Sequence, residues 1–377
     1  MILLNNHLFV IKLFFANISS KSILALGLML GTAYAQEFPW HLGSLDPSAS
    51  APAAINTAGV KPGPNQVVVA VIDSGVLPDH PSLKGRLLPG YDMISGTNNL
   101  RGARSPDFTP DARHATCGER LSSSTFRTHG TEIASLIAGN GIKGVYGVNP
   151  AAKIVPIRLF GACRTSRADM LDAIAWSAGL PVEGVPANVN PANVINLSFY
   201  GGKNTCGADL QALINALNRK NIFLVAAVGN SFGRKLMEPA NCDGVISVGA
   251  IDPENNIANY SALDPRTVVY APGGGRPLES KTPWHTNKLQ VATYDMNLMG
   301  DEIAIADARG MGTSYSASLV SGFISLILSN KPDFTREEFV QYLNANARSV
   351  NRSAKCAECR PKGLSMVAAL LQQMKSD

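Results

Sequence analysis

The stretch QVVVAVIDSG, residues 66–75, decides how this chain folds. Its apolar and mostly β-branched residues follow one another without alternation, which is typical of a strand buried on both faces, as in a parallel sheet. Asp73 comes at the end of this run. Open α/β sheets place their sites at the carboxyl ends of their strands. The stretch therefore predicts a central strand that delivers an acid to a site.

Short apolar runs alternate with helical patterns along the rest of the chain. Further strands are predicted over residues 153–159, 194–199, 222–228 and 244–250, and helices over residues 128–139, 168–177 and 209–217. This alternation predicts an α/β fold with a mostly parallel central sheet and helices on both faces. Because no repeat or linker divides the body, we expect one domain over residues 36–377.

The composition is typical of a compact globular enzyme. Of the 377 residues, 45% are hydrophobic and 16% are charged, which excludes a disordered or fibrous chain. The formal charge is +5, but residues 1–35 hold two lysines and no acid, so the remainder carries 33 − 2 = 31 basic and 28 acidic residues. A balance this even gives no support to nucleic acid as a partner.

Residues 1–35 have the pattern of a secretory signal peptide. Lys21 precedes a short apolar run over residues 22–35, which ends in Ala33-Tyr34-Ala35, so cleavage is expected before Gln36. The run is too short for a comfortable membrane span, although an uncleaved anchor is the alternative. We therefore expect an exported protein, secreted or periplasmic, without a membrane span after removal of the leader.

Six cysteines, an even number, predict disulfides in an exported chain. They are Cys117, Cys163, Cys206, Cys242, Cys356 and Cys359. The last two form a CxxC motif, and the sequence offers no second ligand pair nearby for a zinc site. A small local disulfide between Cys356 and Cys359 is therefore expected.

Three reactive side chains lie among small residues at the ends of predicted elements: Asp73, His129 in THGT and Ser314 in GTS, ahead of an apolar helix over residues 319–328. A serine hydroxyl needs an imidazole to take its proton, and a carboxylate holds that imidazole in the required tautomer. The order Asp, His, Ser is one of the known orders of this device. Taken singly, the three could be a turn residue, a helix-start residue and a helix N-cap.

A fourth motif follows the predicted strand 222–228. Asn230, in the sequence GNS, can direct its side-chain amide at an oxyanion that develops nearby, and such a donor contributes about 3–4 kcal/mol where it has been measured. The alternative is an ordinary turn asparagine after a glycine. All four motifs in this order favour nucleophilic catalysis over four unrelated structural roles.

With these motifs the chain resembles the subtilisin-like serine peptidases, the subtilases, from about residue 38 to the segment 361–367. It is most similar to the secreted, disulfide-bearing subtilases of Gram-negative bacteria through segments 178–181, 184–188 and 271–275. The resemblance implies that Ser314 is the nucleophile, that His129 is the general base and then the acid, and that Asp73 orients it. Asn230 and the backbone N–H of Ser314 would form the oxyanion hole. The chemistry requires no cofactor.

The resemblance also implies how a protein or peptide substrate would bind, as an extended strand between two walls. These walls are Arg164, Thr165 and Ser166 on one side and Ser198, Phe199, Tyr200 and Gly201 on the other. A disulfide between Cys163 and Cys206 is implied next to the walls, which leaves Cys117 for Cys242. Arg164 and Arg167 would favour acidic substrate side chains, with two solvated surface arginines as the alternative.

The chain departs from the family pattern in four places. Residues 315–319, Tyr-Ser-Ala-Ser-Leu, replace the usual Met-Ala-Ala/Ser-Pro-His after the serine. Tyr200 takes a position that is normally glycine, which should narrow the pocket for the residue before the scissile bond. Between Ala35 and Asp73 there is no room for the family's N-terminal inhibitory propeptide, so the protein would fold unaided, would use another helper, or would have drifted from proteolysis. The loop 140–145 contains Lys143, and no calcium site is assigned there.

Three functional hypotheses result. The first is an exported endopeptidase that works through an acyl-enzyme. The second is a subtilase-fold protein with lost or very narrow activity that acts as a binding or maturation partner, as the missing propeptide and Tyr200 would allow. The third is an exported esterase, which has less support because Gly312 and Ser316 flank Ser314 in place of a G-x-S-x-G motif.

Overall fold

A nine-stranded sheet runs through the described part of the chain in the order β10-β11-β7-β6-β5-β4-β1-β3-β2. We use a computed structural model, which describes residues 38–44, 50–93, 128–160, 166–201, 203–231, 235–275, 288–295, 304–351, 356 and 358–364. The strands are β1 Val68–Asp73, β2 Tyr91–Asp92, β3 Lys153–Arg158, β4 Val194–Leu197, β5 Phe223–Ala227, β6 Ile246–Ile251, β7 Val269–Pro272, β10 Arg348–Ser349 and β11 Lys362–Gly363. Every neighbouring pair is parallel except β10 with β11. The predicted, mostly parallel sheet is confirmed.

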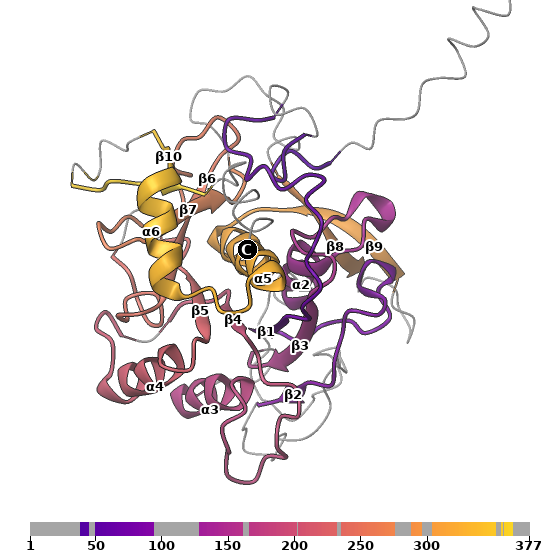
Figure 1. Ribbon diagram of the computed structural model, residues 1–377, viewed down its shortest axis with the longest axis vertical. Coiled ribbons are helices and arrows are strands. Elements are labelled where there is room, and N and C mark those ends of the chain that lie inside the picture. The colour runs from indigo at the N-terminus through magenta and orange to yellow at the C-terminus, as the bar shows by residue number, and fades with distance from the viewer. Residues whose placement is uncertain are drawn as a thin grey trace, which may run out of the picture. The chain divides into compact units, whose positions relative to one another are not determined.

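Helices follow the strands as the alternation predicted. They are α2 His129–Ala138, α3 Arg167–Ser177, α4 Ala208–Asn218, α5 Thr313–Asn330 and α6 Arg336–Asn346, with short 3-10 turns η2 Pro81–Leu83 and η5 Ile142–Gly144. An antiparallel hairpin of β8 Leu289–Asp295 and β9 Ala304–Gly310 stands apart from the main sheet (Figure 1). The sequence did not predict this hairpin, α6 or β7.

The strand β1 has no polar face because both of its faces are covered. Val69 and Val71 belong to one hydrophobic core, together with apolar residues of α2, α5 and α6. Val68, Ala70 and Ile72 belong to a second core, which they share with α3 and α4. Figure 1 shows α2 and α5 near the centre of the molecule and α3 with α4 on the other side of the strands. The unbroken apolar run of β1 is thus the consequence of a three-layer arrangement.

The helix α5 is buried along almost its whole length, which agrees with its apolar sequence. Several of its buried serines bond back to the backbone of the preceding turn, as when Ser318 Oγ donates to the Tyr315 carbonyl at 2.7 Å. Ser321 Oγ instead donates to the side chain of Asn196 in β4 at 2.9 Å. These bonds satisfy the polar groups of α5 inside the core.

Two further predictions can be compared with the structure. Cys356 and Cys359 are joined by a disulfide, as the CxxC spacing predicted. The leader, residues 1–35, lies outside the described residues. Among the helices that the structure describes, none has both the length and the apolar character needed to cross a membrane.

We predict that Phe323→Ala in α5 lowers the free energy of unfolding by about 3–5 kcal/mol, because it leaves a cavity where a fully buried ring packs against Phe339 and Tyr342. Urea denaturation measures the change. Val189→Ala is the matched control: this side chain is 81% exposed, so its loss should cost no more than about 0.5 kcal/mol. Equal effects of the two substitutions would contradict the assignment of α5 as the core helix.

Candidate active site

Asp73 is held in a fully buried position at the carboxyl end of β1. Its backbone carbonyl accepts the N–H of Leu159, just past β3, at 2.7 Å. Its side-chain Oδ1 accepts the backbone N–H of Ser74 at 2.7 Å. The sheet on one side and the following turn on the other therefore fix the direction in which the carboxylate points.

The sequence His129-Gly130-Thr131 starts α2 directly against this turn. A Cβ on residue 130 would lie 2.1 Å from the carbonyl oxygen of Gly75, so only glycine fits there. The N–H of Gly130 donates to Ser74 Oγ at 3.0 Å, and the Thr131 hydroxyl accepts the N–H of Leu77 at 2.9 Å. The small residues around His129 thus dock the start of α2 onto the end of β1.

This docking brings His129 into contact with Asp73. His129 Nδ1 lies 2.8 Å from Asp73 Oδ1 and 2.9 Å from Oδ2, and the imidazole side chain is only 12% exposed. Burial by itself lowers the pKa of this imidazole, but the charge and hydrogen bond of Asp73, together with the charge of Glu132, outweigh it. The pKa of His129 is therefore raised above its ordinary value of 6.5.

Ser314 is the second residue of α5, and its side chain contacts Ser198, the residue that follows β4. Its hydroxyl donates to the backbone carbonyl of Ser198 at 2.8 Å, while Ser198 Oγ donates to the Ser314 carbonyl at 2.9 Å. The residue at the N-cap is Gly312, so the N-cap interpretation of Ser314 is wrong. The start of α5 supplies Ser314 with unpaired backbone N–H groups and a partial positive charge.

Asn230 lies just past β5 with its side-chain amide fixed by residue 313. The backbone N–H and the hydroxyl of Thr313 approach Asn230 Oδ1 at 3.0 and 2.9 Å. An N–H can only donate, so the atom that it contacts must be the amide oxygen. This leaves the Asn230 amide nitrogen, in an exposed residue, available to donate a hydrogen bond. The arrangement has the polarity that an oxyanion site requires.

Tyr200 lies across the backbone next to this asparagine. A Cβ on Gly229 would lie 2.9 Å from ring atoms of Tyr200, so the ring rests directly on the glycine. Gly229 has φ of +99°, and its conformation and its contact with the ring both demand glycine. Tyr200 as a whole is 42% exposed. Tyr200 therefore covers the turn that carries Asn230.

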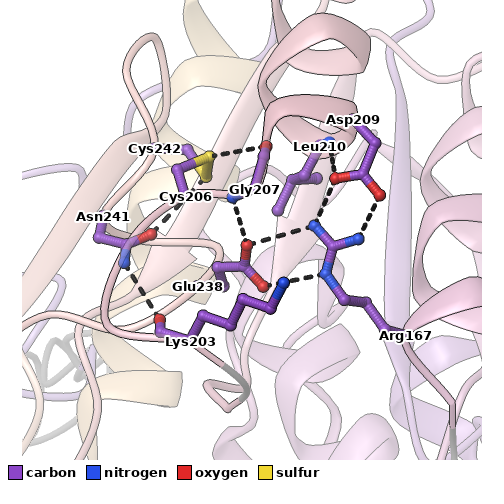
Figure 2. A network of polar contacts seen from close by, with 9 residues as sticks. All are labelled: Arg167, Lys203, Cys206, Gly207, Asp209, Leu210, Glu238, Asn241 and Cys242. Carbon is purple, nitrogen blue, oxygen red and sulfur yellow. Dashed lines mark hydrogen bonds and ion pairs between the residues drawn. A yellow bond between two sulfur atoms is a disulfide. The ribbon is translucent and has the colours of Figure 1, made fainter.

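The segment after Tyr200 is tied down by a network around Glu238 (Figure 2). The Gly201 N–H donates to the Glu238 carbonyl at 3.1 Å, and the Gly207 N–H donates to its carboxylate at 2.6 Å. Arg167 pairs with the same carboxylate at 3.3 Å and also with Asp209. Arg167 is thus neither a solvated surface arginine nor free to bind an acidic substrate residue.

The disulfide pairing implied by the family resemblance is wrong for Cys206. This residue is joined to Cys242 (Figure 2), and backbone hydrogen bonds of Gly201 and of Lys203 with Glu238 also hold the two segments together. The implied pairing of Cys117 with Cys242 is wrong for the same reason. Cys117 and Cys163 lie outside the described residues. The bridge links the segment that follows residues 198–201 to the segment that contains Glu238.

The other proposed wall is described only at its end. Arg164 and Thr165 lie outside the described residues. Ser166 is the N-cap of α3 and forms a capping box with Asp169, so its side chain serves the helix. On the opposite wall, Phe199 contacts Phe160, with their ring centroids 6.0 Å apart.

Sequence reasoning missed Glu132, which is the hydrogen-bond partner of Tyr315. Glu132 is buried in the first turn of α2, three residues after His129, and it accepts a hydrogen bond from the Tyr315 hydroxyl. An acid inside the otherwise apolar helical pattern of residues 128–139 was the available signal. Its partner could not be read from the sequence because it lies 183 residues further along.

Comparisons with known proteins agree with this geometry. The model of the subtilase family (Peptidase_S8) matches residues 64–361. The chain is 36% identical over 278 residues to the extracellular basic protease of Dichelobacter nodosus and 34% identical over 287 residues to an extracellular protease of Xanthomonas campestris. These matches cover 70% and 74% of this chain but only 43% and 47% of the relatives, so the chain spans less than half of their length.

A solved structure extends the likeness to the fold. It comes from work on proteases of Pseudoalteromonas arctica and superposes with a TM-score of 0.68 at 31% sequence identity. The match covers 89% of this chain and 96% of the other.

We predict that the His129 imidazole titrates with a midpoint above pH 6.5, and that Asp73→Asn moves the midpoint below the wild-type value because burial then opposes the charged form with less compensation. Imidazole NMR signals across a pH series measure both midpoints, with His129→Gln to assign the resonance. A wild-type midpoint at or below pH 6.5 would contradict the balance of burial and charge described above.

Proposed function

The chain belongs to the subtilase family, and on this premise we propose that it is an exported serine endopeptidase that uses Asp73, His129 and Ser314. The observation that carries the proposal is the two-oxygen contact of Asp73 with His129 Nδ1, together with Ser314 at the start of a buried helix whose next residue, Tyr315, contacts the imidazole. A nucleophile, a base and an orienting carboxylate give these three residues one common purpose. Protein or peptide chains are the proposed substrates.

We propose one step in peptide hydrolysis for each group. Because Asp73 holds Nδ1, the other ring nitrogen of His129 is left to take the proton of Ser314 as its oxygen attacks the peptide carbonyl. His129 then gives this proton to the leaving amine, which separates and leaves an acyl-enzyme ester on Ser314. A water molecule, deprotonated in the same way by His129, attacks the ester, and the serine is regenerated.

The negative charge that develops on the carbonyl oxygen would be stabilised between α5 and β5. The Asn230 amide nitrogen and the Ser314 N–H at the helix start are the proposed donors. The Ser314 hydroxyl now donates to the Ser198 carbonyl, so it must rotate toward His129 before attack. Catalytic hydrogen bonds often tighten only when substrate binds.

Export is supported by the leader pattern and by the disulfides, which persist in oxidising compartments. Two relatives are named as extracellular proteases, and we infer the same destination for this chain.

One observation favours a second candidate, a subtilase-fold protein of very narrow activity that acts on or binds a particular partner. Tyr200 covers Gly229 beside the proposed oxyanion donor, which restricts the space for the residue before the scissile bond. A casein digest with the purified protein separates the two candidates, since a general endopeptidase degrades casein and a narrow binder leaves it intact.

We predict that a fluorophosphonate probe labels Ser314 in the folded protein, because the probe reacts with an activated serine. Intact-protein mass spectrometry should show one adduct, and Ser314→Ala should remove it. Ser325→Ala is the matched control: it changes a buried serine of the same helix, whose hydroxyl donates to the Gly322 carbonyl and accepts from the Asn149 amide, and it should leave labelling unchanged. A folded wild-type protein that forms no adduct would refute the proposed catalysis.

We predict that Tyr200→Gly widens the pocket for the residue before the scissile bond. Its kcat/KM for a peptide anilide with phenylalanine at that position should rise by at least about tenfold relative to the alanine analogue, since a larger apolar group is then buried. Tyr200→Phe is the control, because it keeps the ring on Gly229 and should keep the wild-type preference. An unchanged ratio in Tyr200→Gly would show that the ring does not line the pocket.

A further inference from the structure

A buried acid and a buried phenol lie together behind His129. The hydroxyl of Tyr315, the residue after Ser314, donates to Glu132 Oε2, and Glu132 is in the first turn of α2 with His129. Both side chains are almost completely buried. Neither is needed for the proton transfers described above, although one is adjacent to the nucleophile and the other is three residues from the base.

The Tyr315 ring touches the imidazole itself. The centroids of the two rings are 6.0 Å apart at an interplanar angle of 76°, an edge-to-face arrangement that aromatic pairs prefer. The ring also packs closely against Gly310 at the end of β9, where a Cβ would lie 2.4 Å from the ring. The position of the phenol is therefore set from several sides, and the imidazole is one of them.

Glu132 is held in place by three hydrogen bonds. Its Oε1 accepts hydrogen bonds from the hydroxyls of Thr128 at 2.6 Å and Thr293 at 3.2 Å, while Oε2 accepts from Tyr315. Three hydroxyl donors satisfy this buried carboxylate, and the N-terminal turn of α2 adds a favourable dipole. The carboxylate connects α2, α5 and β8 at one point.

We propose that Glu132 and Tyr315 form a positioning pair for His129: the carboxylate anchors the phenol, the phenol ring holds the imidazole toward Ser314, and the carboxylate adds a second negative charge beside the base. This role rests on the proposed peptidase function and extends it. Neither residue touches the reacting atoms, so both act through His129.

The charges around the pair determine the expected pH dependence. The groups that act electrostatically on His129 are Asp73 from β1 and Glu132 from its own helix, and Tyr315 faces it from α5. Burial and then the charge and hydrogen bond of Glu132 raise the pKa of Tyr315 well above its ordinary value, so the phenol stays a proton donor at neutral pH. The Glu132 charge favours imidazolium, so its removal should let His129 lose its proton at lower pH.

The experiment measures the rate of fluorophosphonate labelling of Ser314 from pH 5 to 9 in the full chain. The midpoint of the rise reports the protonation of His129, and the plateau reports how well the neutral base is placed. Glu132→Gln keeps the size of the side chain but removes its charge, so we expect the midpoint to fall by on the order of one pH unit. Tyr315→Phe keeps the ring but loses its anchor, so we expect a plateau about tenfold lower at a nearly unchanged midpoint.

Glu338→Gln is the matched control. It makes the same acid-to-amide change at the start of α6, where Glu338 caps the helix and pairs with Lys331, and both midpoint and plateau should stay at wild-type values. Thermal unfolding of each variant separates loss of fold from loss of positioning. If a single variant fails to fold, the double variant Glu132→Gln/Tyr315→Phe replaces it, since removing both partners leaves no unsatisfied buried donor on the tyrosine.

Folded Glu132→Gln and Tyr315→Phe variants with wild-type midpoint and plateau would overturn the proposal and leave the pair as a core hydrogen bond only. A wild-type protein that does not label would refute the peptidase function instead. In that case the His129 imidazole signals still test the pair: the proposal requires a lower NMR midpoint in Glu132→Gln, and an unchanged midpoint refutes it.

Discussion

The hydrogen bond between His129 and Asp73 is the interaction on which the rest of the site depends. It forms in a place where burial alone would keep the imidazole neutral, and the carboxylate reverses that preference. To make this contact, α2 must start within van der Waals distance of the turn after β1, and Gly130 permits it. The close approach is possible because β1 is central, with β3 and β4 on its two sides and helices over both faces.

Much of the fold could be predicted from local sequence, because the spacing of apolar residues along the chain reflects which faces of a strand or helix are buried. The unbroken apolar run of residues 67–72 indicated a strand covered on both faces, and the structure places it inside the mostly parallel sheet, between β3 and β4. The hairpin β8–β9 and the helix α6 were not predicted. The sequence pattern of α6 is mostly polar, with an apolar face made by Phe339, Tyr342 and Leu343 that becomes clear only against α5.

The residues of the candidate site were easier to predict than their partners. Asp73, His129, Asn230 and Ser314 each carry a local signature of small neighbours, since close packing at strand and helix ends demands it. Pairings across long stretches of chain carry no such signature. The bond of Cys206 to Cys242 and the ion pair of Arg167 with Glu238 depend on how two loops meet, and spacing alone could not distinguish them from the alternatives.

Tyr200 and Tyr315, the two aromatic residues that depart from the family pattern, are accommodated in the same way. Tyr200 rests on Gly229 and Tyr315 fills a recess at Gly310, so each added ring is matched by a residue without a side chain. The polar end of Tyr315 is matched as well, because a buried phenol without an acceptor would cost free energy and Glu132 supplies that acceptor. Both rings are thus accommodated without a steric clash, and the phenol without an unpaired hydroxyl. The packing around the imidazole–carboxylate contact and the polar partner of Tyr315 are therefore parts of one arrangement, in which the glycine, the ring and the acid depend on one another.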